Sequence, residues 1–409
     1  MALDFFTMDD FDFAGKTVIV RVDINCPVDD KGKISESERL AAHAQTLKEL
    51  SGLGARTAIL AHQGRPGDAD FLPLQQHADA LSKLIGKKVQ YVSEVIGPYA
   101  IDAIKKLEDG DLLLLENVRY LKEELQELSP AEHAKGQLVQ TLSPLADIFV
   151  NDAFSAAHRS QASLVGFTQA LPSCAGRVMQ REVENVIKVT GNPQHPNTYV
   201  LGGAKPDDCW KLMRNALKKG TVDYVLVSGV LGNLCLAAKG VNIGQSTWDY
   251  YEKKGFSKFF PELKTVVASN AEKIIAPLDL AYEENGARKE ADVSALPDGK
   301  SFLDIGAKTV EKFKEIISQS KTLYLKGPQG VFEQPLFEYG SRETLMAIAN
   351  SSAFSLTGGG HTDEALKKFG IPKEKISYTS LAGGALLTYM AGEPLPALDA
   401  LRENRKKGQ

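Results

Sequence analysis

A stretch close to the N-terminus decides the fold: VIVRVDINCP at positions 18–27. Its first residues are mostly β-branched, which suits a strand that is buried in a sheet. Asp23 and Asn25 follow two positions apart, so an extended chain directs both side chains to the same face. In an open α/β sheet, polar residues at the carboxyl end of a first strand border the ligand crevice. We therefore expect a ligand site at Asp23 and Asn25.

Short apolar segments alternate with helical segments along the whole chain. Strands are predicted near 17–23, 56–61, 88–92, 111–115 and 146–150, and again near 198–202, 222–227, 273–276, 301–304, 321–326, 352–356 and 375–379. This alternation predicts an α/β protein with doubly wound parallel sheets, covered by helices on both faces. The first helix is expected to begin at Ser35, with Glu38 completing a capping box.

The length of the chain predicts more than one domain. At 409 residues it exceeds what a single ordinary core supports. A helix is predicted at 177–189 and ends before Gly191-Asn192-Pro193, where we place the connection. We expect an N-terminal domain at 1–177, a C-terminal domain at 178–392 and a tail at 393–409.

Composition argues against several classes of protein. A net charge of −4 argues against a general nucleic-acid or membrane binder, and no apolar run is long enough to span a membrane. The acidic N-terminus does not match a secretory signal. The 4 cysteines form no C-x-x-C pair, which is typical of reduced thiols in a cytoplasmic protein. We therefore expect no nucleic-acid partner and no membrane partner.

Basic residues follow the predicted strands of the first half. They are His62, Arg65, Arg119 and Arg159, with Arg39 early in the first helix. Because the carboxyl ends of parallel strands meet at one edge of a sheet, these side chains can converge near Asp23. A single arginine is usually a solvated surface residue, so the argument depends on their recurrence. Several guanidinium groups at one edge suit a small substrate with more than one negative charge.

Glycine-rich turns follow the predicted strands of the second half. They are LGGAK at 201–205, SGVLG at 228–232, KGPQG at 326–330, TGGGHT at 357–362 and AGGA at 382–385. Glycine lets the backbone approach a ligand, and free N–H groups at a helix start bind phosphate. These turns favour a nucleotide-phosphate site, although the chain has neither a Walker loop nor a G-x-G-x-x-G motif. Cys209 and Cys235 are expected to be small buried residues rather than nucleophiles.

An ordered set of motifs resembles the phosphoglycerate kinase family over nearly the full length. The motifs are VRVDINCP at 20–27, AHQGRP at 61–66, LLENVRY at 114–120, NDAFSAAHRSQAS at 151–163, LGGAK at 201–205, LDIGAKT at 303–309, KGPQGVFE at 326–333, GGGHT at 358–362 and GEPLPAL at 392–398. Several features are similar to the archaeal branch. The resemblance implies two Rossmann-like domains joined by a hinge helix, and a tail that returns to the N-terminal domain.

The resemblance also implies a reaction and its participants. The reaction is reversible phosphoryl transfer between 1,3-bisphosphoglycerate and ADP, giving 3-phosphoglycerate and ATP in glycolysis and gluconeogenesis. It would proceed in line, with hinge closure and without a general base, because the acceptor is a carboxylate that is already ionised. Mg²⁺ would accompany the nucleotide. We expect a monomer, with a dimer as the alternative.

Site residues follow from the resemblance position by position. The 3-phosphoglycerate site would comprise Asp23, Asn25, Arg39, His62, Gln63, Gly64, Arg65, Arg119 and Arg159. The nucleotide site would comprise Gly202, Gly203, Lys205, Gly229, Lys326, Pro328, Glu333, Gly358, Gly359, Gly360, His361 and Thr362. Arg39 and Lys205 would be the catalytic residues, and Glu333 would meet the ribose.

The nucleotide side departs from the family pattern. Cys209 stands where the family commonly has lysine, Lys326 where it has asparagine, and His361 where it has aspartate. Histidine is a poor ligand for magnesium, so the metal ligands stay open. Two other interpretations remain: a dinucleotide-dependent oxidoreductase of two domains, and a degenerate kinase that serves as a binding or scaffold protein.

Overall fold

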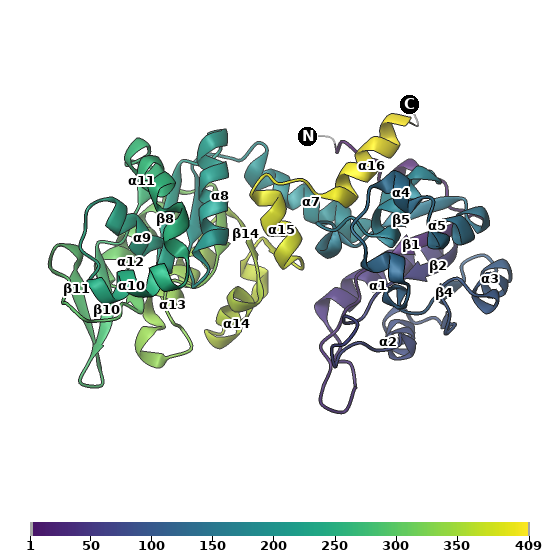
Figure 1. Ribbon diagram of the computed structural model, residues 1–409, viewed down its shortest axis with the longest axis horizontal. Helices are drawn as coiled ribbons and strands as arrows, with labels where there is room; N and C mark the ends of the chain where they lie inside the picture. Colours follow the sequence, from purple (N-terminus) through teal and green to yellow (C-terminus); the bar gives the residue numbers. More distant parts are fainter. Residues whose placement is uncertain (1–2, 408–409) are drawn as a thin grey trace. The chain divides into compact units, whose positions relative to one another are not determined.

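The structure is a computed structural model that describes residues 3–407. The chain divides into two compact units (Figure 1). The first comprises Met1–Glu184 with Pro394–Gln409, and the second comprises Asn185–Glu393. Along the chain, the first unit gives way to the second within helix α7 (Arg177–Thr190).

A six-stranded parallel sheet with the order β3-β4-β2-β1-β5-β6 forms the centre of the first unit. Its strands are β1 (Thr17–Arg21), β2 (Arg56–Leu60), β3 (Val89–Tyr91), β4 (Leu112–Leu114), β5 (Ile148–Asn151) and β6 (Ser173–Ala175). Its helices are α1 (Glu38–Gly52), α2 (Gln75–Ile85), α3 (Pro98–Lys105), α4 (Pro130–His133), α5 (Gln137–Leu142), α6 (Ala162–Val165) and α16 (Pro396–Lys407).

The decisive stretch forms β1 and joins two cores. Val18 and Val20 pack in one cluster, whereas Ile19 packs in the cluster on the other face of the sheet. Successive strand side chains point to opposite faces, so an uninterrupted apolar strand serves both cores. Each fully buried Val or Ile contributes about 1.5–3 kcal/mol. The strand ends at Arg21, so Asp23 and Asn25 lie in the loop beyond it.

The C-terminal helix packs within the first unit. Asn404 in α16 donates to the carbonyl oxygens of Thr168 (2.7 Å) and Leu171 (3.0 Å). Its Oδ1 accepts the backbone N–H of Ser173 in β6 at 3.0 Å. These bonds fix the last helix beside the edge strand of the sheet.

The second unit repeats the architecture with the strand order β15-β14-β13-β7-β8-β9. These parallel strands are β7 (Asn197–Leu201), β8 (Tyr224–Val227), β9 (Ile274–Ile275), β13 (Thr322–Lys326), β14 (Phe354–Gly358) and β15 (Tyr378–Ser380). The helices are α8 (Pro206–Lys219), α9 (Gly229–Ala238), α10 (Gln245–Lys253), α11 (Phe260–Ser269), α12 (Ala307–Gln319), α13 (Tyr339–Ala349), α14 (Gly360–Lys368) and α15 (Gly383–Met390). Two parallel-sheet α/β domains are thus confirmed.

A third, antiparallel sheet was not expected. It has the order β11-β10-β12 and consists of β10 (Asp279–Glu284), β11 (Ala287–Asp292) and β12 (Asp304–Ile305). The prediction of a strand of the parallel series at 301–304 was wrong, because the strand there is β12 and pairs antiparallel with β10. The predicted start of the first helix was also early: Ser37 caps α1 by accepting the N–H of Leu40 at 3.2 Å.

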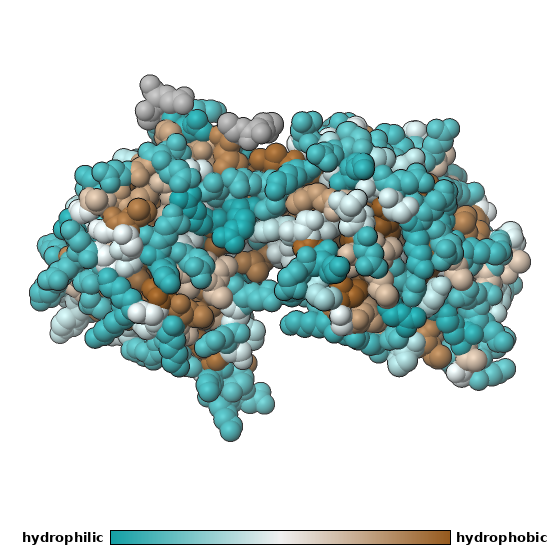
Figure 2. Space-filling model, turned by 180° about the vertical axis from the view of Figure 1, so that it is seen from behind, coloured by the Kyte–Doolittle hydropathy of each residue, from teal (hydrophilic) through white to brown (hydrophobic). Residues whose placement is uncertain are grey.

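Within residues 3–407, no helix is both long and apolar enough to cross a membrane. Figure 2 shows a largely hydrophilic surface on the face that it presents, with hydrophobic residues in small patches.

Candidate active site

In the first unit, Asp23 lies at the centre of a polar cluster beyond the end of β1. Its carboxylate is 3.2 Å from Nη1 of Arg39 and accepts a hydrogen bond from the Ser155 hydroxyl. Burial raises the pKa of this carboxyl group, but the Arg39 guanidinium and the hydrogen bond from Ser155 lower it, and the net pKa lies well below its usual range. Asp23 is therefore a fixed anion that orients donors.

The arginine side chains around this carboxylate outnumber the acidic side chains there. Burial, followed by repulsion from Arg159 and Arg21, lowers the pKa of Arg119 to about 10, and Arg65 contributes in the same direction. Arg119 is 5% exposed, whereas Arg159 is half-buried and Arg65 is exposed. Guanidinium groups that repel one another at a partly open edge favour a bound anion.

Arg21 determines which ring nitrogen of His62 carries the proton. Its Nη2 donates to Nδ1 of His62 at 3.0 Å, and its Nε donates to Ser163 at 2.7 Å. Because Nδ1 accepts, the neutral imidazole carries its proton on Nε2. Burial lowers the pKa of His62 well below its usual value, and the surrounding arginines add to this shift. His62 is thus held as a neutral hydrogen-bond donor.

Asn25 and Gln63 join two loops at this edge. Asn25 Oδ1 accepts the N–H of Gly64 at 2.8 Å, and Gln63 exchanges bonds of 2.8 and 3.0 Å with the backbone of Cys26. The Gln63 side chain is fully buried and also donates to the Asp70 carbonyl at 3.1 Å. It faces the protein interior, whereas Asn25 is half-buried beside the cluster.

Several residues of this cluster were not singled out from the sequence. They are Arg21, His43, Glu124, Asp152, Ser155 and Ser163. Arg21 belongs to the opening stretch, and Asp152, Ser155 and Ser163 belong to the motif at 151–163, so position within those motifs was an available signal. His43 and Glu124 lie outside the quoted motifs, and only the folded chain brings them to the cluster.

In the second unit, a cavity of about 1040 Å³ lies along the carboxyl edge of the sheet. Every residue that the sequence analysis assigned to the nucleotide site lines it: Gly202, Gly203, Lys205, Gly229, Lys326, Pro328, Glu333, Gly358, Gly359, Gly360, His361 and Thr362. The lining also includes residues that were not expected, among them Asn233, Thr247 and Tyr251.

Several helix N-termini at this cavity carry no side-chain cap. Helices α8, α14 and α15 begin after Lys205, Gly359 and Ala382, and none of these residues makes a side-chain cap hydrogen bond. The first N–H groups of a helix need partners, and the helix dipole favours an anion there. Space is available, since a Cβ at Gly359 or Gly360 would meet no atom within 4 Å. This end of the cavity therefore suits phosphate groups.

The turns after β7, β8 and β13 pack against one another through glycine. A Cβ at Gly202 would clash with the Pro328 carbonyl, and one at Gly229 would clash with Gly203. Gly229 also has a φ of +56°, which disfavours other residues. The close packing of these backbones forms the floor of the cavity.

Lys326 is a half-buried cation at this cavity. Its side chain is 18% exposed, and Nζ lies 3.9 Å from Asp208 in the first turn of α8. Cys209 does not line the cavity; burial raises the pKa of its thiol to about 12, which makes it a small buried residue as expected. Lys205 and His361 are exposed at the cavity.

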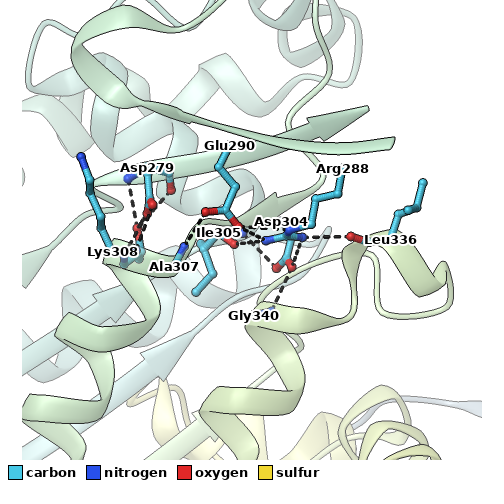
Figure 3. Close-up of polar contacts among 10 residues, drawn as sticks. Asp279, Arg288, Glu290, Asp304, Ile305, Ala307, Lys308, Leu336 and Gly340 are labelled. Atoms are coloured by element: carbon cyan, nitrogen blue, oxygen red, sulfur yellow. Dashed lines mark hydrogen bonds and ion pairs between the residues drawn. The ribbon is translucent and has the colours of Figure 1, made fainter. Parts of the chain in front are cut away.

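A network of ion pairs and hydrogen bonds fixes one wall of the cavity (Figure 3). Arg288 in β11 pairs with Asp304 at 2.9 Å and donates to the carbonyls of Ile305 (2.8 Å) and Leu336 (3.0 Å). Asp304 also accepts the N–H of Gly340 at 2.9 Å. Asp304 and Ile305 line the cavity, so the small antiparallel sheet holds this wall in place.

The residues at the cavity do not form a metal cage. Within the described part of the chain, no group of three or more His, Cys, Asp or Glu side chains is placed to hold a metal ion. Mg²⁺ usually keeps several waters and is bound by one or two carboxylates together with substrate phosphates. The cavity lining includes the carboxylates of Asp208 and Glu333, which could assist a magnesium ion that the phosphates of a nucleotide hold.

The comparisons with known proteins find matches over nearly the full length of this chain. A family model described as phosphoglycerate kinase matches residues 8–393. Phosphoglycerate kinase of Methanothermus fervidus is 44% identical, covering 98% of both chains, and that of Methanopyrus kandleri is 45% identical, covering 97% of both. The crystal structure of the Pyrococcus horikoshii enzyme superposes with a TM-score of 0.85 at 38% identity, covering 98% of this chain and 100% of that chain.

A bacterial structure gives the same result. Phosphoglycerate kinase from Coxiella burnetii has a TM-score of 0.85 at 32% identity and covers 98% of this chain and 99% of that chain. The chain therefore belongs to the phosphoglycerate kinase family, whose members are phosphotransferases with a carboxyl group as acceptor.

Proposed function

We propose that this enzyme carries out reversible phosphoryl transfer between 1,3-bisphosphoglycerate and ADP through the two sites described above. The observation that carries the proposal is the pairing of chemistries: an excess of arginines around Asp23 in one unit, and uncapped helix N-termini around a cavity in the other. The first suits a phosphorylated carboxylic acid, and the second suits a nucleotide.

In the first unit, Arg65, Arg119 and Arg159 bind the phosphate and carboxylate of 3-phosphoglycerate. The Asp23 carboxylate accepts a hydrogen bond from its hydroxyl group, the Asn25 amide also bonds to that hydroxyl, and the Nε2–H of His62 donates to the substrate. Gln63 and Gly64 act through the backbone geometry that they impose on the loops, since the Gln63 side chain is used within the protein.

In the second unit, the glycine-rich turns and helix N-termini bind the phosphates of ATP or ADP. Lys205 and Lys326 supply positive charge, and Glu333 binds the ribose. Mg²⁺ would be held mainly by phosphate oxygens and water, and would neutralise negative charge on the phosphates.

The transfer needs no general base. In the direction that consumes ATP, the attacking group is a carboxylate, which is ionised at neutral pH. Catalysis then consists of alignment and neutralisation of charge on the moving phosphoryl group. Arg39 and Lys205 are placed in these roles. Because they belong to different units, the proposal includes a closing motion that also excludes water from the acyl phosphate.

A coupled assay tests the proposal. With Mg-ATP and 3-phosphoglycerate, ATP consumption should require 3-phosphoglycerate and should stop when EDTA exceeds the metal. An enzyme that consumes no ATP with 3-phosphoglycerate, but binds ATP in calorimetry, would support the scaffold alternative. Oxidation of NADH without ATP would support the oxidoreductase alternative. We also propose that the protein acts as a monomer in the cytoplasm.

A further inference from the structure

Arg288 in β11 bonds to the wall of the nucleotide cavity but does not itself line the cavity (Figure 3). Its Nε and Nη2 donate to Glu290 at 3.1 and 3.0 Å, and its Nη1 donates to Asp304 at 2.9 Å. The other two N–H groups of the guanidinium donate to backbone carbonyls, that of Ile305 at 2.8 Å and that of Leu336 at 3.0 Å. All the N–H groups of this side chain are thus used, and two of them serve no ion pair.

The Asp304 carboxylate is enclosed where β12 meets the segment that follows β13. Its side chain is fully buried, and a Cβ at Gly330 or Gly340 would clash with it. A buried ion pair adds little stability by itself, because removing two charges from water costs about as much as their attraction provides. A pair whose members also bond to several backbone segments is better explained as a device that fixes geometry.

Glu333 lies between two anchors of this segment to the small sheet. Before it, the N–H of Val331 donates to the carbonyl of Leu303 at 2.8 Å. After it, the carbonyl of Leu336 accepts the bond from Arg288. Glu333 is exposed and lines the cavity, so the path of the backbone between the anchors decides where its carboxylate lies.

We propose that Arg288 is a positioning residue, which acts through the Leu336 carbonyl to hold Glu333 against the ribose hydroxyls of the nucleotide. This inference rests on the ribose contact of the proposed function and adds the residue that maintains it. The planar guanidinium reaches Asp304, Ile305 and Leu336 at once, whereas a lysine carries its N–H groups on a single nitrogen. Loss of the guanidinium should therefore weaken the ribose contact and leave the phosphate-binding end of the cavity unchanged.

Calorimetry on the full chain tests this with three probes: ATP, 2′,3′-dideoxy-ATP, which lacks both ribose hydroxyls, and inorganic tripolyphosphate. The unmodified protein should bind ATP about tenfold more tightly than dideoxy-ATP, the ratio expected for hydrogen bonds to a carboxylate. In R288K this ratio should fall to about threefold or less, because the charge beside Asp304 is kept but the bond to Leu336 is lost. The affinities of R288K for dideoxy-ATP and tripolyphosphate should change by less than about twofold.

R342K is the matched control. Arg342 lies over the same Tyr339 ring as Arg288, but its side chain is 39% exposed and pairs with Glu338 and Glu343. It should keep the ratio of the unmodified protein. R288Q, a shorter side chain without charge, should show the same fall in the ratio as R288K, so the test does not depend on one variant. Far-UV circular dichroism verifies that each variant is folded at the temperature of the assay.

A ratio in R288K equal to that in R342K would overturn the inference while leaving the proposed function intact. An equal loss of affinity for all three probes would also overturn it, since Arg288 would then support the whole cavity. In the E333A background, R288K should change none of the three affinities, and a further loss there would mean that Arg288 does not act through Glu333. Equal affinity of the unmodified protein for ATP and dideoxy-ATP would instead overturn the ribose contact within the proposed function, and the inference with it.

Discussion

His43 donates from Nδ1 to Oδ2 of Asp152 over 2.8 Å, and both residues are buried. The other ring nitrogen of His43 accepts the backbone N–H of Asp23 at 3.3 Å. The second oxygen of Asp152 accepts the N–H groups of Val178 (2.7 Å) and Met179 (3.2 Å). One carboxylate thus connects the loop of the anion site to the first turn of α7.

Replacing Asp152 by Asn should therefore destabilise the first unit. The amide has only one oxygen, so either His43 or the start of α7 loses its acceptor, at a cost of about 2–3 kcal/mol. Urea unfolding followed by far-UV circular dichroism measures this loss. Tryptophan fluorescence would not serve, because Trp210 and Trp248 both lie in the second unit and report on that unit. D147N is the control: Asp147 is exposed and, among residues 3–407, its side chain accepts only the N–H of Thr17. Equal losses in the two variants would contradict the prediction.

Arg39→Ala should lower the turnover number about 10²–10³-fold. The guanidinium lies 3.2 Å from Asp23 and the side chain is 30% exposed, so Arg39 stands at the open side of the polar cluster. The dissociation constant for ATP should change little, because Arg39 and the nucleotide cavity belong to different units. Steady-state kinetics together with calorimetry separates the two quantities. R214A, which removes a surface arginine paired with Glu262, serves as the control. Turnover that is the same in R39A and R214A would remove Arg39 from the mechanism.

Lys326→Met should weaken ATP binding about tenfold or more, as expected for a charge-assisted phosphate contact. Its effect should grow with the number of phosphates, so that ADP is affected less than ATP and adenosine hardly at all. Calorimetry with these three ligands provides the test. K211M is a matched control, because Lys211 lies on the same unit, 49% exposed, in an ion pair with Glu393. A loss of adenosine affinity equal to the loss of ATP affinity would indicate structural damage and not a lost phosphate contact.

The parts of this fold that local chemistry dictates could be predicted from the sequence. Strand β1 is apolar on both faces, and the turn glycines are needed wherever backbones touch, as at Gly202 and Gly229. The small antiparallel sheet could not be predicted in this way. Strand β11 is mostly exposed and charged, and β12 has only two residues, so neither shows a strand pattern. Tertiary contacts, above all the pair of Arg288 and Asp304, hold them in place.

The candidate site likewise has residues that could be predicted from the sequence and residues that could not. The residues that we propose to face the ligand, such as Arg119 and Gly359, follow strands β4 and β14 in the sequence, so the strand pattern was enough to single them out. The residues that orient them come from distant positions. Arg21 and His62 are 41 residues apart, and His43 and Asp152 are 109 residues apart. No periodicity in the sequence links such pairs, so the protonation of His62 could be assigned only from the folded chain.

The stability of the first unit should fall in mild acid because of His77. This residue is fully buried, its Nε2 lies 3.0 Å from Oε1 of Gln63, and its Nδ1 has no partner among the described residues. Burial lowers the pKa of His77 to about 4, from 6.5. The native state thus keeps the neutral ring, so its stabilising contribution is complete above pH 6.5 and is lost as the pH falls toward 4. The loss should approach about 3 kcal/mol, at 1.36 kcal/mol for each unit of pKa. Urea unfolding by far-UV circular dichroism at several pH values should show a shallower acid dependence in H77Q, which keeps an N–H donor for Gln63 but cannot be protonated. An unchanged dependence in H77Q would mean that His77 takes up no proton on unfolding in this range, and that other groups cause the acid sensitivity.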